Sequence, residues 1–251
     1  MIELKNLTAG YSRQNCLTGL DLRVEDGILT VLLGPNGCGK SMLLKTIAGI
    51  LPVYGGEILV DGIPVSQMSS RQLAQRVSYM AQTRNTPNII ARRMVLHGRF
   101  PYLSYPRRYS RADHELARQA LQAADALDIA DRPMPELSGG QRQKVYLAMA
   151  LAQDTNTILM DEPMNFLDVQ HQLGLIRTAH SLAASGKAVL LVMHDIRLAM
   201  QCADRLVIMS DRGIGLSASA EEVYDSGLID EVFKIRLCRT ETPAGWQYYY
   251  L

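Results

Sequence analysis

Cysteine is scarce in this chain, and its spacing excludes two kinds of small structural scaffold. The 251 residues include only Cys16, Cys38, Cys202 and Cys238, and no two of them form a C-x-x-C pair. This spacing argues against a zinc site or a disulfide framework, and it is typical of proteins from a reducing compartment.

Excess charge and long apolar stretches are missing too. The formal net charge is +1, so no overall field draws the protein to nucleic acid or to an anionic membrane. No continuous apolar run approaches the roughly 20 residues that a membrane-spanning helix needs. The opening MIELK does not resemble a signal peptide. Any membrane role would therefore come through a partner.

The composition is that of an ordinary globular protein. Hydrophobic residues make up 47% of the chain and charged residues 20%, as in soluble domains. There is no internal repeat, low-complexity tract or long linker. We expect residues 1–251 to form a single domain.

The most informative stretch is GPNGCGKS at residues 34–41. It fits the phosphate-loop pattern G-x-x-x-x-G-K-[ST], in which glycines let backbone N–H groups approach phosphate oxygens. Lys40 supplies a positive charge for the β- and γ-phosphates, and Ser41 supplies a hydroxyl for Mg²⁺. Residues 28–33 are typical of a buried strand and residues 42–48 of a helix, with Gly49 a plausible left-handed stop. Strand, loop and helix are the context that a nucleotide site requires.

Short strands are expected around this loop. Residues 2–33 alternate apolar and polar. Residues 55–62 are expected to form a strand between turn signals, and residues 77–81 another strand that ends at Gln82. Tyr11 lies in the first of these stretches. A lone tyrosine on a strand is more often a packed or surface residue than a nucleotide contact.

From residue 83 to about 152 the pattern becomes helical. Residues 89–99 and 111–127 have helical spacing and are separated by a Pro- and Tyr-rich loop, which predicts a helical insertion into an α/β core. Arginines interleaved with tyrosines could bind RNA, but we favour a solvated or partner-facing surface because the rest of the chain adds no net positive charge. These arginines are Arg84, Arg92, Arg93, Arg99, Arg107, Arg108 and Arg111.

Three further motifs place polar residues where ligands bind. LSGGQ at residues 137–141 opens a strong helix, and Ser138 with two glycines makes a second potential anion site. The apolar strand 157–161 ends in Asp161 and Glu162, which are positioned to hold Mg²⁺ and to orient or deprotonate water. The apolar strand from residue 188 ends likewise at His194.

Together these motifs resemble the ATP-binding subunit of an ABC transporter. The order of the motifs along the chain is highly specific to this family: the phosphate loop comes first, followed by Gln82, LSGGQ, the strand ending in Glu162, and His194. The resemblance covers residues 2–235. It implies an α/β fold, a P-loop NTPase core with a mixed sheet and N-terminal antiparallel strands. In this interpretation residues 1–82 and 153–251 form the core, and residues 83–152 form the helical subdomain with the signature motif.

The resemblance also implies residue roles and partners. Tyr11 matches the aromatic residue that stacks on adenine, and residues 165–168 match a loop that crosses a dimer interface. In the family's head-to-tail dimer, ATP at one phosphate loop is capped by LSGGQ of the second copy. The further expected partners are integral membrane permease subunits and, indirectly, an extracytoplasmic substrate-binding protein, with no nucleic acid. The implied location is the cytoplasmic face of the plasma (inner) membrane, with attachment through the permease.

The expected site follows residue by residue. The expected catalytic residues are Glu162, His194 and Gln82, and the expected Mg²⁺ ligands are Ser41, Gln82 and Asp161. The residues expected to bind ATP are Tyr11, Gly34, Pro35, Asn36, Gly37, Cys38, Gly39, Lys40, Ser41, Met42, Ser138, Gly139, Gly140 and Gln141.

Residues 97–103, 149–155 and 161–172 carry a narrower resemblance. They resemble the corresponding parts of importers that serve ferric siderophores, haem and cobalamin. Some positions depart from the common family residues: Met42 replaces Thr, Met164 and Asn165 replace Thr-Thr, and Lys144 replaces Arg. None of these replacements removes a group with a chemical role.

Two other functions stay open at this point. A soluble ABC ATPase of an assembly system, such as iron–sulfur cluster building, would keep the same motifs. A translation or repair ATPase would need a tandem second half or a long coiled coil, and neither is found in this sequence.

Overall fold

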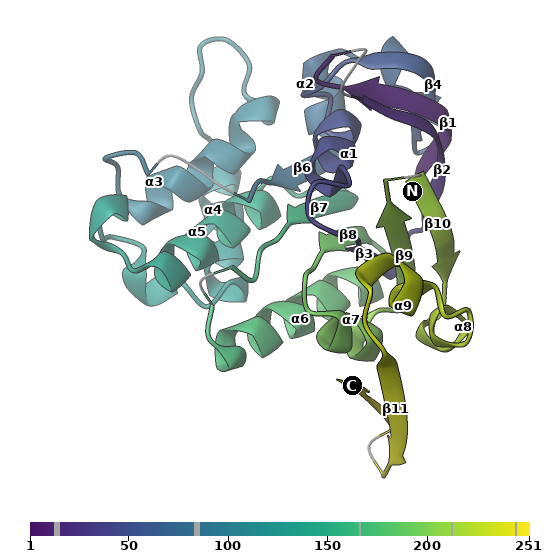
Figure 1. Cartoon of the computed structure of the whole chain (residues 1–251). Coiled ribbons are helices and arrows are strands. Elements are labelled where there is room, and N and C mark those ends of the chain that lie inside the picture. The colour runs from purple at the N-terminus through teal and green to yellow at the C-terminus, as the bar shows by residue number, and fades with distance from the viewer. Residues whose placement is uncertain (13–15, 83–85, 166, 212, 244) are drawn as a thin grey trace.

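The computed structural model describes residues 1–12, 16–82, 86–165, 167–211, 213–243 and 245–251. Two layers of sheet and a group of helices surround the segment after β3 (Figure 1). The strands before residue 100 are β1 (Ile2–Gly10), β2 (Cys16–Val24), β3 (Leu29–Leu33), β4 (Val53–Val60), β5 (Ile63–Pro64) and β6 (Val77–Met80). The later strands are β7 (Thr157–Asp161), β8 (Ala188–Val192), β9 (Arg205–Ser210), β10 (Gly213–Ala218), β11 (Leu237–Thr242) and β12 (Gly245–Tyr250).

The strands form an antiparallel N-terminal sheet and a larger central sheet. The N-terminal sheet has the order β2-β1-β4-β5. The central sheet has the order β10-β9-β3-β8-β7-β6, and every pair in it is parallel except β9 with β10. The predicted mixed α/β architecture with N-terminal antiparallel strands is therefore confirmed. Since β3, β6, β7 and β8 run in parallel, their carboxyl ends meet at one edge of the sheet.

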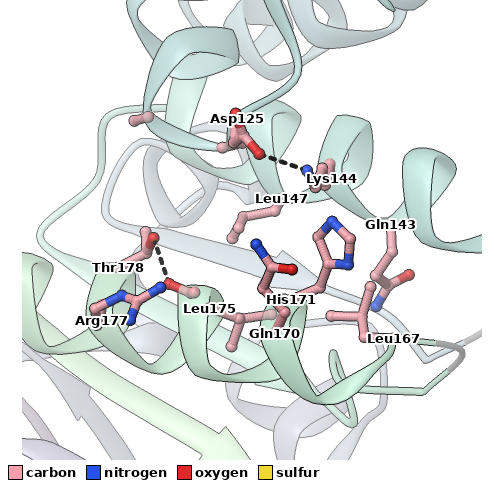
Figure 2. A pocket seen from close by; sticks show the side chains of 13 residues that line it. Asp125, Gln143, Lys144, Leu147, Leu167, Gln170, His171, Leu175, Arg177 and Thr178 are labelled. Atoms are coloured by element: carbon pink, nitrogen blue, oxygen red, sulfur yellow. Dashed lines mark hydrogen bonds and ion pairs between the residues drawn. The ribbon is translucent and has the colours of Figure 1, made fainter.

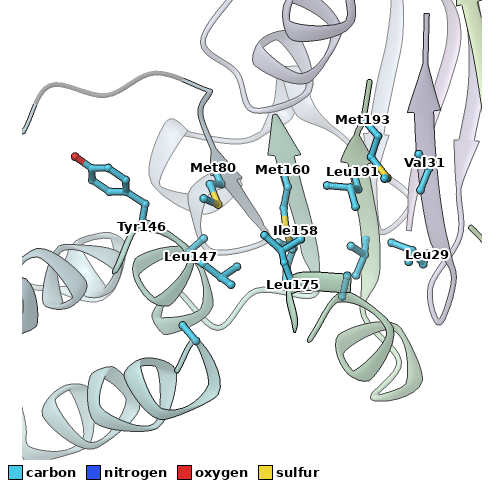
Figure 3. Packing of buried hydrophobic residues seen from close by; sticks show 14 of the residues in the cluster. Leu29, Val31, Met80, Tyr146, Leu147, Ile158, Met160, Leu175, Leu191 and Met193 are labelled. Carbon is cyan, nitrogen blue, oxygen red and sulfur yellow. The ribbon is translucent and has the colours of Figure 1, made fainter. Parts of the chain in front are cut away.

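The central sheet is buried on both faces because its strands are continuous apolar runs. Leu32, Leu159 and Leu190 face a cluster with α1 (Lys40–Ile47) and the N-terminal sheet. The alternate residues face a second cluster with α5 (Gly139–Ala152), α6 (Val169–Ala184) and α7 (Ile196–Cys202), and Figure 3 shows Ile158, Met160 and Leu191 among them. This two-sided packing fixes the strand ends that carry the polar motifs.

Between β6 and β7 the described residues contain helices and no named strand. The α-helices are α3 (Ala91–Leu96), α4 (Arg111–Ala123) and α5 (Gly139–Ala152). The helix expected over residues 89–99 is shorter than predicted, and a 3₁₀ segment follows it at His97–Tyr102. Gly98 there packs so closely on α5 that a Cβ would lie 2.2 Å from the Met149 carbonyl oxygen.

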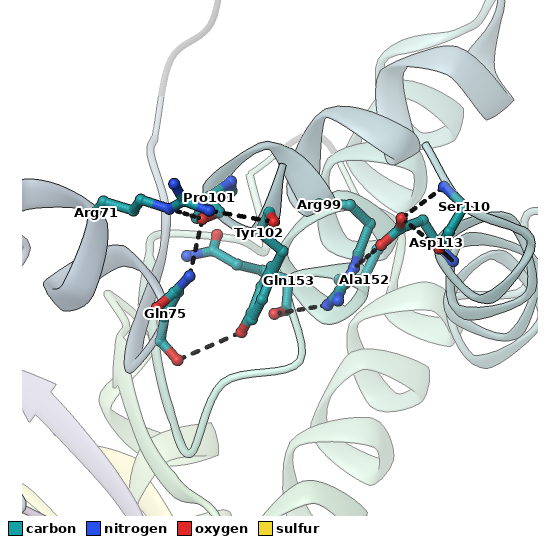
Figure 4. Close-up of polar contacts among 9 residues, drawn as sticks. All are labelled: Arg71, Gln75, Arg99, Pro101, Tyr102, Ser110, Asp113, Ala152 and Gln153. Atoms are coloured by element: carbon teal, nitrogen blue, oxygen red, sulfur yellow. Dashed lines mark hydrogen bonds and ion pairs between the residues drawn. The ribbon is translucent and has the colours of Figure 1, made fainter. Parts of the chain in front are cut away.

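The structure corrects the expectation for one arginine of this region. Arg99 is buried instead of solvated, and its Nε donates a 3.0 Å hydrogen bond to Asp113 at the start of α4. Its Nη1 donates to the carbonyls of Ala152 and Gln153 at the end of α5 (Figure 4). Arg99 therefore ties the far end of the LSGGQ helix to α4. Arg84 lies outside the described residues.

The remaining elements complete the periphery. The short helix α2 (Ser70–Ala74) is capped by Ser69, and α8 (Ala220–Asp225) and α9 (Leu228–Phe233) follow β10. Strands β11 and β12 pair with each other in a hairpin that projects from the body (Figure 1). Among the described helices, none combines the length and apolar character that a bilayer crossing requires.

Candidate active site

The loop between β3 and α1 has a conformation that requires glycine. Gly37 and Gly39 have φ of +85° and +106°, in the left-handed region where a side chain is strained. A Cβ on Gly34 would lie 2.5 Å from the Met209 carbonyl oxygen. The loop can therefore pass close to β9 and wrap around the start of α1, where helix dipole and free N–H groups favour an anion.

Lys40 lies inside this loop. Its Nζ donates hydrogen bonds to the carbonyl oxygens of Gly34, at 2.7 Å, and Pro35, at 3.0 Å, and the residue is buried. Carbonyl oxygens thus hold the ammonium group beside the backbone of the loop. The neighbouring Cys38 is buried, and burial raises the pKa of its thiol, so this cysteine stays uncharged at neutral pH.

Asp161 stands at the end of β7 with both oxygens held by hydroxyl groups. Ser41 Oγ donates to Oδ1 at 2.9 Å, and Tyr79 Oη donates to Oδ2 at 3.0 Å. Burial raises the pKa of the Asp161 carboxyl, the hydrogen bonds from Ser41 and Tyr79 oppose this, and the charge of Glu162 adds to it. No lysine or arginine of the described ranges forms an ion pair with Asp161. A buried carboxylate beside a serine hydroxyl is a set of hard oxygen donors that fits Mg²⁺.

Glu162 is the next residue, and it is surrounded by three hydrogen-bonding side chains. Its backbone is in the left-handed region, with φ of 50°, and only 8% of the residue is exposed. Gln82 Nε2 and Asn165 Nδ2 both donate to Oε2, the latter at 3.0 Å, and His194 Nε2 lies 2.5 Å from Oε1. The structure therefore brings together the three residues that were expected to be catalytic. The contact of Asn165 was missed.

Tyr11 lies near the same helix but on the surface. Its side chain is 54% exposed, and its hydroxyl accepts a 2.9 Å hydrogen bond from Lys45 Nζ on α1. The Lys45 ammonium also lies 5.5 Å from the centre of the ring. An aromatic face is therefore available to solvent beside the helix that follows the phosphate loop.

The LSGGQ segment lies elsewhere, at the start of α5. Ser138 caps the helix: its Oγ accepts from the Gln141 N–H at 3.2 Å, and its own N–H donates to Gln141 Oε1 at 3.0 Å. Residues 138–141 line an open cavity of about 630 Å³ together with Lys144, Asp168 and His171. In the part of the chain that the structure describes, no hydrogen bond or ion pair links residues 138–141 to residues 34–42. One chain alone does not join its two anion sites.

A smaller cavity of about 240 Å³ adjoins this region between α5 and α6. Lys144 and His171 line both cavities, and Lys144 forms a 2.6 Å ion pair with Asp125 (Figure 2). The loop expected to cross a dimer interface runs into α6, where Asp168 caps the helix by accepting from the His171 N–H. Phe166 of that loop lies outside the described residues.

Three features define a P-loop ATPase cassette: a glycine-rich anion loop, a carboxylate pair at the end of a parallel strand of the same sheet, and a second helix start with paired glycines. The family model of the ABC transporter matches residues 17–165, and the chain belongs to this family. ABC cassettes bind ATP.

Similar proteins span almost the whole chain. The petrobactin import ATP-binding protein FpuD of Bacillus anthracis is 35% identical over 96% of this chain and 89% of its own length. The ferric enterobactin transport ATP-binding protein FepC of Escherichia coli is 32% identical over 96% of this chain and 90% of its own. The hemin import ATP-binding protein HmuV of Hahella chejuensis is 37% identical over 87% of both chains.

Solved structures agree on the fold. An ABC transporter of metal-chelate type in an inward-facing conformation superposes with a TM-score of 0.84, at 23% identity, over 100% of this chain and 97% of that one. The dimeric bacterial ABC transporter cassette MJ0796 gives a TM-score of 0.77 at 26% identity, over 88% of this chain and 99% of its own.

Proposed function

We propose that this chain is the ATP-hydrolysing subunit of an importer for an iron–siderophore, haem, cobalamin or related metal chelate. The observation that carries this proposal is the similarity, over nearly the whole chain, to ATP-binding proteins of petrobactin, enterobactin and hemin uptake. The site geometry supplies the ATPase part. The assembly-system alternative is not favoured, because the similar proteins named above are transport proteins.

ATP binding is assigned to the loop and its surroundings. The backbone of residues 34–42 surrounds the phosphates, and the Lys40 ammonium moves from the carbonyls of Gly34 and Pro35 to phosphate oxygens. Charged hydrogen bonds of this kind are roughly twice as strong as neutral ones. Tyr11 offers its exposed ring to the adenine base.

Ser41, Asp161 and Gln82 would hold Mg²⁺. The donor chemistry supports this, since the Asp161 carboxylate is buried and is paired only with hydroxyl groups among its recorded partners. When bound, the ion neutralises negative charge on the phosphates.

Hydrolysis is assigned to the group around Glu162. Its carboxylate is the base that orients the attacking water and takes its proton. Gln82 and His194 hold the two oxygens of that carboxylate, and we assign the γ-phosphate contact to His194. Because the carboxylate is nearly enclosed, its orientation is set by these neighbours more than by solvent.

The second half of the ATP site comes from another copy of the chain. Among the described residues, Ser138, Gly139, Gly140 and Gln141 form no hydrogen bond or ion pair with the phosphate loop of their own chain. A head-to-tail dimer would bring them to the ATP of the partner. The dimeric MJ0796 cassette supports a dimer. The complete ATPase is then a dimer with two composite sites.

Movement of this dimer is transmitted to a membrane permease. We assign the chain to the cytoplasmic face of the plasma (inner) membrane, attached through the permease, with an extracytoplasmic substrate-binding protein as an indirect partner and no nucleic acid. Residues 83–152 act as the helical subdomain, and residues 1–82 and 153–251 as the core.

The test is a pull-down of tagged Glu162→Gln protein with ATP from detergent-solubilised native cells. We expect a polytopic membrane protein to co-purify at one-to-one stoichiometry. A soluble scaffold without any membrane chain would overturn the transport assignment and leave only the ATPase. Omission of ATP is the control, since a dimer that needs ATP should then separate.

A further inference from the structure

We propose that Asn165 is a positioning residue for Glu162, and that its carboxamide fixes the orientation of the carboxylate that activates water. The inference rests on the proposed function, because it presupposes that Glu162 is the catalytic base. It departs from the sequence-based expectation, in which the replacement at this position was chemically neutral.

The direct contact is a hydrogen bond within one tight turn. Asn165 Nδ2 donates to Glu162 Oε2 at 3.0 Å, and the Asn165 N–H donates to the Glu162 carbonyl at 3.4 Å. Glu162 itself has a left-handed backbone. The turn thus folds the amide back over the carboxylate three residues earlier.

The turn is also fixed to the rest of the protein. Gln143, which is buried on the LSGGQ helix, donates from Nε2 to the Pro163 carbonyl at 2.7 Å. The side chain of Met164 packs against the hydrophobic cluster under the sheet. With the residues between Glu162 and Asn165 held on both sides, the amide has a defined position from which to donate.

Asn165 differs in one respect from the other two groups on this carboxylate. Gln82 and His194 come from the ends of other strands and have assigned duties toward Mg²⁺ and the γ-phosphate. Asn165 has no assigned contact with the nucleotide, so its amide can stay on Glu162 while those two side chains turn to the ligand. A threonine here, the common family residue, carries its hydroxyl one bond closer to the backbone and would not extend as far.

The experiment compares Asn165→Thr with wild type, each in the Glu162 and the Glu162→Gln background. We expect kcat to fall about tenfold and KM for ATP to stay within about twofold, because a hydrogen bond to a charged group is lost while Gln82 and His194 remain. In the Glu162→Gln background the residual rate should not fall further. Asn156→Thr, the same change at an exposed residue before β7, is the matched control.

A second readout needs no nucleotide. In urea unfolding of the four proteins, Asn165→Thr should raise the unfolding equilibrium constant about tenfold when residue 162 is Glu. The increase should be only about threefold when residue 162 is Gln, because the hydrogen bond to Asn165 then has an uncharged acceptor. If Asn165→Thr fails to fold, Asn165→Asp serves instead; it keeps the shape, removes the donor and should slow hydrolysis by more than tenfold.

Each outcome decides between the two assignments. Wild-type hydrolysis in Glu162→Gln would remove the proposed catalytic base and, with it, the basis of the inference. A slow Glu162→Gln together with Asn165→Thr indistinguishable from Asn156→Thr would overturn the inference alone. Equal slowing by Asn165→Thr in both backgrounds would also overturn it, because the residue would then act through some other group.

Discussion

The two helix starts assigned to phosphate, those of α1 and α5, are built in opposite ways. Helix α1 has Gly39 at its N-cap position and no side-chain cap, and its first residue, Lys40, is buried. Helix α5 has the exposed Ser138 at its N-cap position, with a complete capping box. The N–H groups at the start of α1 are therefore left without a side-chain cap that a ligand would have to displace, while α5 already satisfies part of its own.

This difference indicates that the two helix starts have different roles in binding ATP. The α1 end lies beside Asp161 and has the enclosed surroundings in which electrostatic contacts are strong. The α5 end is a stable, open surface that needs no ligand to hold its shape. We infer that ATP binds first at α1, and that α5 of a second copy docks onto it as a preformed lid.

The largest expected effect lies on the α1 side. Glu162→Gln should bind ATP but hydrolyse it roughly 10²–10⁴ times more slowly, the usual scale for general acid–base help. Steady-state phosphate release and binding of a fluorescent ATP analogue measure the two parts. Glu241→Gln, on the exposed hairpin, is the control; a similar loss there would mean that the assay reports folding.

The next effect concerns how α5 is held. Arg99→Met should lower the free energy of unfolding by about 3–5 kcal/mol, because it leaves the buried Asp113 carboxylate unpaired. Urea denaturation measures this, with the exposed Arg108→Met as control. A surface ion pair is worth about 1 kcal/mol or less. A loss of unfolding free energy below this value would mean that the start of α5 does not depend on the contacts of Arg99 at the end of that helix.

Lys40→Ala tests which helix start binds ATP in the separate chain. We expect ATP binding to weaken by about 1.5–3 kcal/mol, the value of hydrogen bonds to charged groups. Ser138→Ala should leave ATP binding by the monomer unchanged. Equal weakening by both variants, measured by nucleotide displacement, would contradict the division between the two helices.

The smallest effect separates capping from function. Ser138→Ala and Ser219→Ala both remove the serine of a capping box, at α5 and at α8. Each should cost about 1 kcal/mol of stability, but only Ser138→Ala should also reduce hydrolysis. Thermal unfolding and ATPase assays on the same samples make the comparison, and matching losses of activity would remove the functional role of Ser138.

Local patterns in the sequence predicted β3, β6, β7 and β8, the glycine loop and the start of α5, because these depend on neighbouring residues. The meeting of Gln82, Glu162 and His194 depends on the order of strands in the sheet, and only the family resemblance supplied it. Helix α6 was not predicted: Val169 and Leu173 on it face solvent, which obscures the apolar stripe of an amphipathic helix. Strand β11 was missed because its run Leu-Cys-Arg-Thr-Glu-Thr has no clean apolar alternation.

The hydrogen bond of Asn165 shows another limit of pattern reading. A comparison with the common family residues identifies this position as a departure, but it gives no direction for the side chain. That direction comes from the left-handed turn at Glu162 and from Gln143 on a helix that starts more than twenty residues earlier. Both are properties of the folded chain.

The enclosed charges at the phosphate loop have a consequence for the lifetime of the empty protein. Lys40, Asp161 and Glu162 are all less than 9% exposed, and folding brings these charges out of water before any nucleotide arrives. A ligand that binds only the folded form raises its stability, by about 2.7 kcal/mol at a hundred times its Kd. The nucleotide-free chain should thus be the form most easily lost to proteolysis, so that ATP preserves the protein as well as driving its motion.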